Sequence, residues 1–446
     1  MIERDAVRRA LGPLPMPAEE IREFVAAVGQ PPPPAVRLRR GLDPAELPFP
    51  VRPIAWSSTG FFLSDRGRPS ADVRYACGDY YIQDAGSLLA VTLLNAQPHE
   101  RICDLCAAPG GKATAALEEM DAGGWLLANE PVRARHGALQ FNLARHGGTR
   151  FAVSCLDPHL LSGIVGPVFD AVLVDAPCSG QSLLGRGKQT DSAYRPRTIE
   201  FCAARQARIL AAAAGLVRPQ GRLVYSTCTF SFAENEGQVE HFLQRHPAWK
   251  LERAERLEAF ASSRLPGCYR LWPHRDGCGG AFAALLRRSD DVDGAPAGAP
   301  RVARPARLVP AALPREFGAW GELRSAHVWG SGRRCFAWPE PLWPPLLAVA
   351  EAGPEAACRE GSTWFPAYAL AMRRDPQWTP AARVALDERQ ASKYLRGESL
   401  SSSLRGWCVA TWNERPLGWM KGDGSRLKNH LPKPGRLDTQ RKGPCG

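Results

Sequence analysis

The sequence has no long apolar run, and that absence limits what the protein can be. No segment approaches the roughly 20 consecutive apolar residues that a membrane-spanning helix needs. The first nine residues, Met1–Arg9, hold no apolar core of the kind that a secretory signal requires. These absences predict a cytosolic protein with no membrane partner.

A disulfide framework is missing as well. The 13 cysteines are odd in number and scattered through long apolar segments, which is not the pattern of a small secreted protein. Cys103 and Cys106 form a C-x-x-C pair, but no second pair has the spacing that would complete a zinc site. We therefore expect reduced thiols and no metal, with these two cysteines buried in a strand and a loop.

Acidic residues are too few to balance the arginines. The formal net charge is +12, and eight of the 57 basic residues are lysines. Such a surface favours a polyanion, and nucleic acid is the first candidate partner. A proteome rich in arginine would give the same excess without such a partner. Residues 381–446 hold 13 basic and 6 acidic residues, so this end of the chain supplies +7 of the total.

What the sequence does contain, from about residue 76 to 290, is an alternation of short apolar runs and helical patterns. Helical patterns cover 131–146 and 198–217. The apolar runs are Arg101–Leu105, Trp125–Asn129, Phe151–Cys155, Phe169–Asp175 and Gly221–Ser226. This alternation predicts an α/β fold, with a Rossmann-like, doubly wound and mostly parallel sheet covered by helices on both faces. Ligands bind such sheets beyond the carboxyl ends of the strands.

Composition divides the chain into five parts. The N-terminal part combines a helical pattern at 18–28, four prolines at 31–34, and a basic stretch, Val36–Arg40. That stretch alternates like an edge strand, which either faces RNA or is merely solvated. The predicted parts are a small α+β RNA-binding domain (1–75), a catalytic domain (76–288), a linker rich in Ala and Pro (289–314), an intermediate segment (315–380) and a basic module (381–446).

A glycine-rich loop follows the first strand of the catalytic domain. It comprises Cys106, Ala107, Ala108, Pro109, Gly110, Gly111 and Lys112. Small residues let the backbone approach a ligand, and the helix that follows offers free N–H donors. The loop is neither G-x-G-x-x-G nor G-x-x-x-x-G-K-[ST], which disfavours a nicotinamide cofactor and a nucleoside triphosphate. An adenosyl cofactor fits better, with Glu130 on the ribose and Asp157 near the adenine.

Two cysteines follow apolar strands. Cys178 lies in Asp-Ala-Pro-Cys-Ser-Gly, which starts at Asp175, and Cys228 lies in Ser-Thr-Cys-Thr. A thiolate that adds to carbon 6 of a pyrimidine makes carbon 5 nucleophilic toward an activated methyl group, and a carboxyl group at ring N3 stabilises the charge. A base must then remove the carbon 5 proton so that the thiol can leave. Two cysteines and Asp175 satisfy this chemistry; otherwise one or both thiols are core residues.

Residues from about 80 to 290 resemble the Nol/Nop/Sun family of RNA cytosine-5 methyltransferases. The matching motifs are Gln83–Ser87, the 106–112 loop, Asp175–Gly180, Tyr225–Thr229 with Glu234–Glu236, and Arg270–His274 leading to Gly280–Ala283. Segments at 387–397, 416–421 and 426–433 look like the tail of the bacterial ribosomal RNA branch (RsmF-like), which resembles PUA-type RNA-binding barrels. The chain departs from the family at Gln181, where an acidic residue is more usual.

The resemblance implies a class I methyltransferase domain that uses S-adenosylmethionine and a PUA-like C-terminal RNA-binding domain. Cys228 would be the nucleophile, Cys178 would assist product release, and Asp175 would contact both the base and the methyl donor. The cofactor would lie on the 106–112 loop, and Arg135 matches a family arginine of the following helix. The expected substrate is 16S ribosomal RNA or the small ribosomal subunit, and the expected oligomeric state is a monomer.

Other functions fit parts of the sequence. Transfer RNA suits the same catalytic residues, because only the tail favours ribosomal RNA. A ribosomal RNA assembly factor would not need both cysteines and the cofactor loop. A DNA cytosine methyltransferase would use the Pro-Cys thiol and leave Cys228 unexplained. In the tail, Trp407, Trp412 and Trp419 either stack on RNA or, as we expect for most of them, fill the core of a small barrel.

Overall fold

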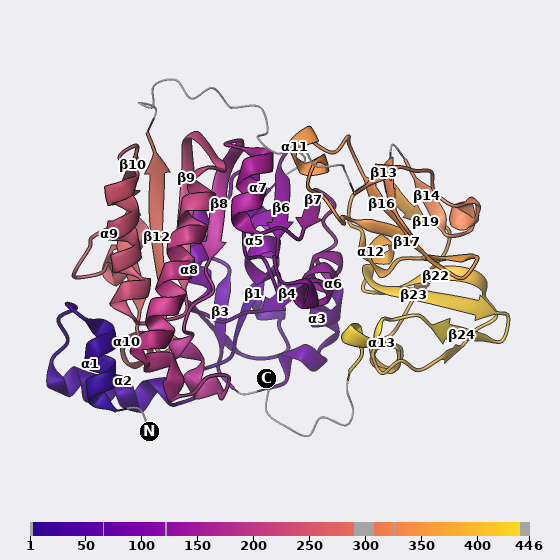
Figure 1. Cartoon of the computed structure of the whole chain (residues 1–446). Coiled ribbons are helices and arrows are strands. Elements are labelled where there is room, and N and C mark those ends of the chain that lie inside the picture. The colour runs from indigo at the N-terminus through magenta and orange to yellow at the C-terminus, as the bar shows by residue number, and fades with distance from the viewer. Residues whose placement is uncertain (1–2, 66, 121–122, 290–306, 325, 438–446) are drawn as a thin grey trace.

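The computed structural model describes residues 3–65, 67–120, 123–289, 307–324 and 326–437. Within these residues the strands form a small N-terminal sheet, a large central sheet and three sheets in the C-terminal third. The C-terminal sheets lie beside the β7 edge of the central sheet (Figure 1), where the chain bridges Val153 to Ala352.

The central sheet has the strand order β10-β12-β9-β8-β5-β6-β7, with β11 paired to β12. Its parallel strands are β5 (Arg101–Asp104), β6 (Trp125–Asn129), β7 (Phe151–Ser154), β8 (Phe169–Asp175) and β9 (Val217–Thr227). Its antiparallel strands are β10 (Trp249–Glu252), β11 (Cys268–Leu271) and β12 (Ala281–Arg288). The five predicted runs coincide with the five parallel strands, so the predicted fold class is confirmed.

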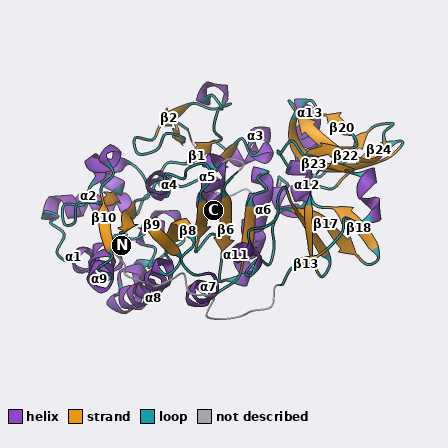
Figure 2. Ribbon diagram, turned by 90° about the horizontal axis from the view of Figure 1, so that it is seen from above, coloured by secondary structure: helices purple, strands orange, loops and turns teal. Residues whose placement is uncertain are grey.

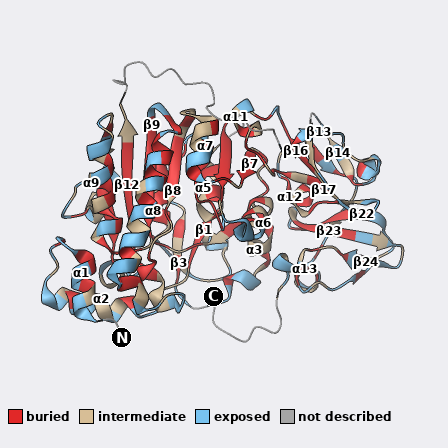
Figure 3. Ribbon diagram, viewed as in Figure 1, coloured by how far each residue is buried: buried red, intermediate tan, exposed pale blue. Residues whose placement is uncertain are grey.

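Helices cover both faces of this sheet (Figure 2). One face carries α4 (Leu88–Leu94), α5 (Gly111–Glu119) and α6 (His136–His146), and the other carries α7 (Pro158–Val165), α8 (Pro196–Ala214) and α9 (Glu236–Arg245). Residues 171–174 of β8 have no exposed surface as a result (Figure 3). Double-sided burial explains why these strands read as continuous apolar runs.

The N-terminal segment forms a separate sheet against the carboxyl edge of the central strands. Its helices are α1 (Arg4–Leu11), α2 (Ala18–Val28) and α3 (Val73–Cys77), and its strands are β1 (Ala35–Leu38), β2 (Val51–Pro53), β3 (Gly60–Leu63) and β4 (Tyr80–Ile82). The predicted edge strand at 36–40 is wrong, because β1 lies between β3 and β4. Arg37 is buried there and donates to Gln83 Oε1 at 3.1 Å and Thr114 Oγ1 at 2.9 Å, so it faces neither solvent nor RNA.

The intermediate segment is also a β structure. Its sheet runs β13 (Val309–Pro310), β15 (His327–Ser331), β16 (Arg334–Trp338), β17 (Glu355–Glu360) and β18 (Thr363–Pro366), while β14 (Gly321–Leu323) pairs with β19 (Trp378–Pro380). Short helices are α10 (Pro273–Asp276) in the catalytic part, α11 (Pro344–Leu347) and α12 (Tyr368–Met372). Residues 290–306 of the predicted linker lie outside the described residues. Val309 and Pro310, which the linker prediction also included, form β13.

The tail is a small curled sheet with one helix, α13 (Glu388–Leu395). Its strand order is β20 (Arg383–Ala385), β22 (Arg405–Trp412), β23 (Arg415–Asp423), β24 (Arg426–Asn429) and β21 (Leu400–Ser401). Trp407, Trp412 and Trp419 are 9%, 8% and 1% exposed, so they fill the core as expected. Nowhere in the described ranges does a helix combine the length and apolarity needed to cross a bilayer.

Candidate active site

The carboxyl ends of β8 and β9 bring the two predicted cysteines together. The strands pair in parallel with Asp175 opposite Ser226, so the loops that follow them start at the same edge of the sheet. Cys178 Sγ lies 3.2 Å from Cys228 Sγ, and the Cys228 backbone N–H donates to Cys178 Sγ at 3.4 Å. Both thiols are partly exposed, whereas Cys103 and Cys106 are buried as predicted. A substrate can therefore approach the sulfur pair.

The hydrogen bond between the two sulfurs makes them unequal. Hydrogen bonding to Cys228, followed by burial, raises the pKa of Cys178 well above its ordinary value. Either sulfur can donate the hydrogen bond that joins them. Because the thiolate is the nucleophilic form, the raised pKa disfavours Cys178 as a nucleophile.

Two segments converge on the Asp175 carboxylate at the end of β8. Lys112 of the cofactor loop lies 2.7 Å from Oδ2, and the Ser226 hydroxyl of β9 donates to Oδ1 at 2.8 Å. Burial lowers the pKa of Lys112, but the charge and hydrogen bond of Asp175 together with the charge of Asp104 more than offset this, and the net shift is upward. Lys112 stays cationic, and a charged pair sits between the cofactor loop and the cysteines.

A buried carboxylate braces the loop that carries Cys178. Glu234 has no exposed surface and accepts hydrogen bonds from the Ser179 backbone N–H at 2.9 Å and from Gln206 Nε2 at 3.0 Å. The Ser179 hydroxyl also donates to Glu234, at 2.5 Å. Burial raises the pKa of Glu234 although these donors oppose the rise. The sequence motif contained Glu234, but these contacts span 28 to 55 residues and could not be read from spacing.

Gln181 joins the two cysteine loops through both ends of its side-chain amide. Its Oε1 accepts from the Phe230 N–H at 2.9 Å, and its Nε2 donates to the Ala193 carbonyl at 3.1 Å. A carboxylate accepts but does not donate, so only an amide satisfies both backbone groups at once. The Ser182 N–H adds a direct bond to the Cys228 carbonyl at 3.1 Å. The Gln181 side chain therefore helps to hold the two loops in place.

The predicted cofactor residues meet at the ends of β5, β6 and β7. Gly110 turns the loop with a φ of +112°, a value that favours glycine, and α5 begins at the next residue. Glu130 is 1% exposed and accepts from the Ala108 N–H at 3.3 Å and from Arg135 Nη1 at 3.0 Å. Arg135 thus positions Glu130 instead of reaching away from it. Asp157 is exposed at the N-terminus of α7.

These residues fit an adenosyl group. The carboxylates of Glu130 and Asp157 stand at neighbouring strand ends, where they can accept from ribose hydroxyls and from an amino group. Val132 is 43% exposed beside them, which leaves an apolar surface for a ring. The backbone N–H groups at the start of α5 complete a small, polar cradle.

Comparison with known proteins agrees with this arrangement. A family model described as the 16S rRNA methyltransferase RsmB/F matches residues 91–287, and one described as the methyltransferase RsmF PUA domain matches residues 381–437. Residues 91–287 and 381–437 are thus similar to the methyltransferase and PUA domains of the RsmB/F proteins. A relative from Klebsiella pneumoniae (strain 342), named ribosomal RNA small subunit methyltransferase F, is 29% identical over 409 residues, which cover 86% of this chain and 84% of the relative.

Solved structures show the same fold. A methyltransferase homolog protein from Pyrococcus horikoshii is 26% identical with a TM-score of 0.53, and the match covers 60% of this chain and 91% of that protein. The structure titled NSun6 from Pyrococcus horikoshii with SFG is 19% identical with a TM-score of 0.55, covering 65% and 98%. The central α/β sheet is therefore a methyltransferase fold.

One acidic residue near the site was not predicted from the sequence. Asp104 ends β5 directly before the cofactor loop and is 2% exposed. Burial, followed by the nearby Asp175 charge, raises its pKa to about 7. Its place at a strand end is the signal that could have found it, but the surrounding run reads as an ordinary buried strand.

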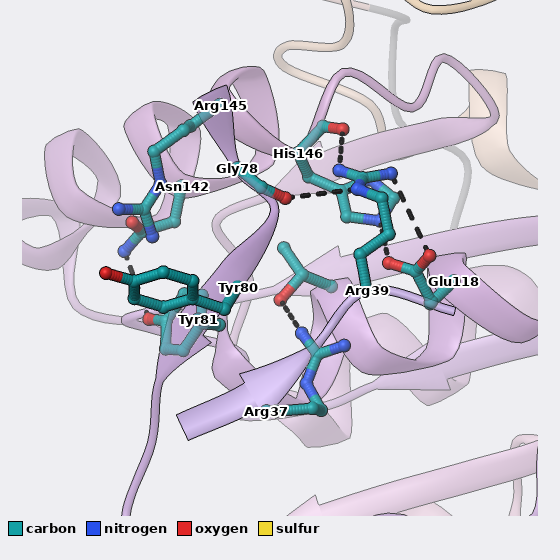
Figure 4. Close-up of a pocket in the computed structure, with 10 residues that line it drawn as sticks. Arg37, Arg39, Gly78, Tyr80, Tyr81, Glu118, Asn142, Arg145 and His146 are labelled. Carbon is teal, nitrogen blue, oxygen red and sulfur yellow. Dashed lines mark hydrogen bonds and ion pairs between the residues drawn. The ribbon is translucent and has the colours of Figure 1, made fainter. Parts of the chain in front are cut away.

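A separate cavity lined by arginines lies where the N-terminal sheet packs on α5 and α6 (Figure 4). Its volume of about 20 Å³ is enough for one water molecule. Arg39 donates to the Gly78 carbonyl at 3.0 Å and to the His146 carbonyl at 2.6 Å, and Arg145 lies 3.8 Å over the Tyr75 ring. Thr114, which accepts from Arg37, donates to the Gly110 carbonyl at 2.8 Å. Arg37 and Thr114 at the cavity therefore help to hold the cofactor loop in place.

Proposed function

We propose that the protein transfers a methyl group from S-adenosylmethionine to carbon 5 of cytosine in 16S ribosomal RNA, through a transient bond between Cys228 and carbon 6. The observation that carries the proposal is the pair of partly exposed sulfurs, 3.2 Å apart, beside the Asp175 carboxylate. A single buried thiol or a lone carboxylate would not support covalent catalysis on a pyrimidine.

The cofactor would supply an electrophilic methyl group when bound. The 106–112 loop, Glu130 and Asp157 would hold it, with Arg135 positioning Glu130. Lys112 and Asp175 lie where the loop meets the cysteines, so they would orient the reacting edge of the base. The ammonium group of Lys112 also places positive charge where the ring gains electrons.

The chain's own groups account for each bond that changes. The Cys228 thiolate adds to carbon 6, and the displaced electron pair makes carbon 5 the nucleophile that takes the methyl group. Cys178 first gives up its own proton to solvent, and its thiolate then accepts the proton on carbon 5. As that proton leaves, the carbon 6–sulfur bond breaks and its electron pair returns to Cys228. A raised pKa makes Cys178 a stronger base for this last step.

The substrate assignment rests on the whole chain and not on the catalytic residues. Relatives aligned over 86% of the chain are named ribosomal RNA small subunit methyltransferase F, and that alignment exceeds the catalytic domain. The tail matches a PUA domain of the same branch and supplies +7 of the net charge, which suits a polyanion. The five domain boundaries, the monomeric state and the cytosolic location remain predictions.

The test is methyl transfer by the full chain from labelled S-adenosylmethionine. Three substrates free of modification are compared: 16S ribosomal RNA made in vitro, transfer RNA made in vitro, and duplex DNA. We expect label in 16S RNA, with bisulfite sequencing placing it on carbon 5 of one or a few cytosines. If label appeared only in transfer RNA, transfer RNA would be the substrate in place of 16S ribosomal RNA. If the protein bound 16S RNA but transferred no label to any RNA, the result would favour an assembly factor.

A further inference from the structure

One flank of α8 combines an exposed aromatic ring with unpaired arginines. Phe201 is 69% exposed, which is the largest exposure of any bulky apolar side chain in the described part of the chain. Arg197, Arg205 and Arg208 are also exposed, and no ion pair is recorded for them among the described residues. We call these four residues the α8 stripe. An exposed phenylalanine among cations marks a surface that binds something.

The spacing makes the stripe continuous. Its members are separated by four, four and three residues, so at about 100° per residue they lie within an arc of about 80° on the helix. From first to last they span about 17 Å of helix at 1.5 Å per residue. The segment 186–208 that contains them holds six basic and two acidic residues, a net charge of +4. The stripe is thus a narrow positive track with an aromatic ring on it.

The neighbouring face of α8 is fixed to the catalytic loop. Gln206 donates to the Pro177 carbonyl at 3.1 Å and to Glu234 at 3.0 Å, and Cys202 lies one helical turn earlier on the same face. Burial raises the pKa of Cys202 to about 11, with smaller contributions from Glu234 and Cys228. Burial raises the pKa of Cys106 too, and the Arg205 charge opposes that rise. The stripe therefore lies on the flank of α8 next to the face that is fixed to the Cys178 loop.

We propose that the α8 stripe holds the single-stranded RNA next to the target cytosine, with Phe201 stacked on a neighbouring base and the arginines on phosphates. This inference rests on the proposed function. A cytosine that leaves its stack to reach Cys228 exposes the faces of the bases beside it. An aromatic side chain then replaces the lost stacking, and the cations beside it follow the backbone.

Charge argues for RNA as the occupant in preference to a protein. The cores of protein interfaces are depleted in charged residues, whereas three of the four members of the stripe are arginines. Arginine also pairs with phosphate through a planar fork of donors. One phenylalanine offers too little apolar area for a stable protein contact, but it is enough to stack one base.

Phe201→Ala in the full chain tests the stacking contact. We expect the KM for protein-free 16S ribosomal RNA to rise about 5- to 100-fold, while kcat and the KM for S-adenosylmethionine stay within about twofold. Phe201→Trp should restore the KM because it keeps a stacking face. The control is Val309→Ala, which removes another exposed apolar side chain, 58% exposed on β13, and should change nothing.

The triple variant Arg197→Gln, Arg205→Gln and Arg208→Gln tests the phosphate contacts. We expect the slope of log affinity against log salt for the same RNA to shrink by about 2, since each lost phosphate contact removes about 0.7. Arg245→Gln, an exposed arginine at the far end of α9, should leave the slope unchanged.

Three outcomes overturn the inference. The first is a wild-type KM in Phe201→Ala. The second is a wild-type salt slope in the triple variant. The third is an Arg205→Gln variant in which only the KM for S-adenosylmethionine rises, because that arginine would then belong to the cofactor site. Failure of the proposed function is distinguishable, since wild-type protein would then methylate no RNA while the salt slopes could still be measured.

Discussion

The sulfur site at the ends of β8 and β9 and the arginine cavity behind α5 are both polar clusters, but they are built for opposite purposes. At the sulfur site, the two thiols are partly exposed and bond mainly to each other. In the cavity, Arg37 is buried and Arg39 is partly buried, and they donate to side chains and carbonyls from three different elements. The first arrangement leaves atoms available for chemistry, and the second uses charge to hold backbone segments in place.

The largest difference between the two regions is expected for a substitution at Cys228. Cys228→Ala should lower methyl transfer by about 10⁴-fold or more, because the covalent route needs that sulfur. The melting temperature should change by less than about 2 °C, since a partly exposed thiol contributes little to packing. Label transfer and thermal unfolding measure the two effects. Cys358→Ala, which removes a partly buried thiol on β17, is the matched control and should keep full activity.

Cys178→Ala separates the roles of the two sulfurs. We expect turnover to fall about 10²- to 10⁴-fold, because the carbon 5 proton is no longer removed efficiently. The bond between Cys228 and RNA should then persist and appear as a slow band on a denaturing gel. An adduct in Cys228→Ala, and none in Cys178→Ala, would reverse the assignment.

The cavity should respond in the opposite way. Arg37→Met should reduce the free energy of unfolding by roughly 2–3 kcal/mol, because Gln83 and Thr114 lose a charged donor in a buried setting. Urea unfolding measures this, and kcat should stay within a few-fold. Arg40→Met breaks an exposed ion pair with Glu119 and should cost less than about 1 kcal/mol. A large loss of kcat in Arg37→Met without a loss of stability would make the cavity part of the active site.

The same contrast explains what the sequence could reveal. The parallel strands were predictable because burial on both faces leaves a run of apolar residues, and the sulfur site because strand ends are fixed by those runs. The position of β1 was not predictable. Its alternation fits an edge strand, and Arg37 is buried only because Gln83 and Thr114, 46 and 77 residues away, supply acceptors. The contacts of Glu234 and the shifted pKa of Asp104 were not predictable for the same reason, since the groups around them come from distant segments.

The smallest effects should appear in the dependence of stability on pH, where the two regions have opposite signs. In the cavity, His146 Nδ1 accepts from the Gly148 N–H at 3.2 Å, so Nε2 carries the proton and donates to Glu118 at 3.0 Å. Burial lowers the pKa of His146 from 6.5 to about 4, so its contribution is complete above pH 6.5 and lost as the pH falls through 4. His146→Gln should flatten that acid limb.

Asp104 at the sulfur site acts in the other direction. Its pKa rises from 3.8 to about 7, so the folded state holds an extra proton between those values and stability declines as the pH rises through them. Asp104→Asn should remove that decline. Each variant changes the slope of unfolding free energy with pH by at most about 1.4 kcal/mol per pH unit, because one proton is involved. The two substitutions should change the slope of unfolding free energy with pH in opposite directions. Changes of the same sign would contradict the opposite effects of burial described for His146 and Asp104.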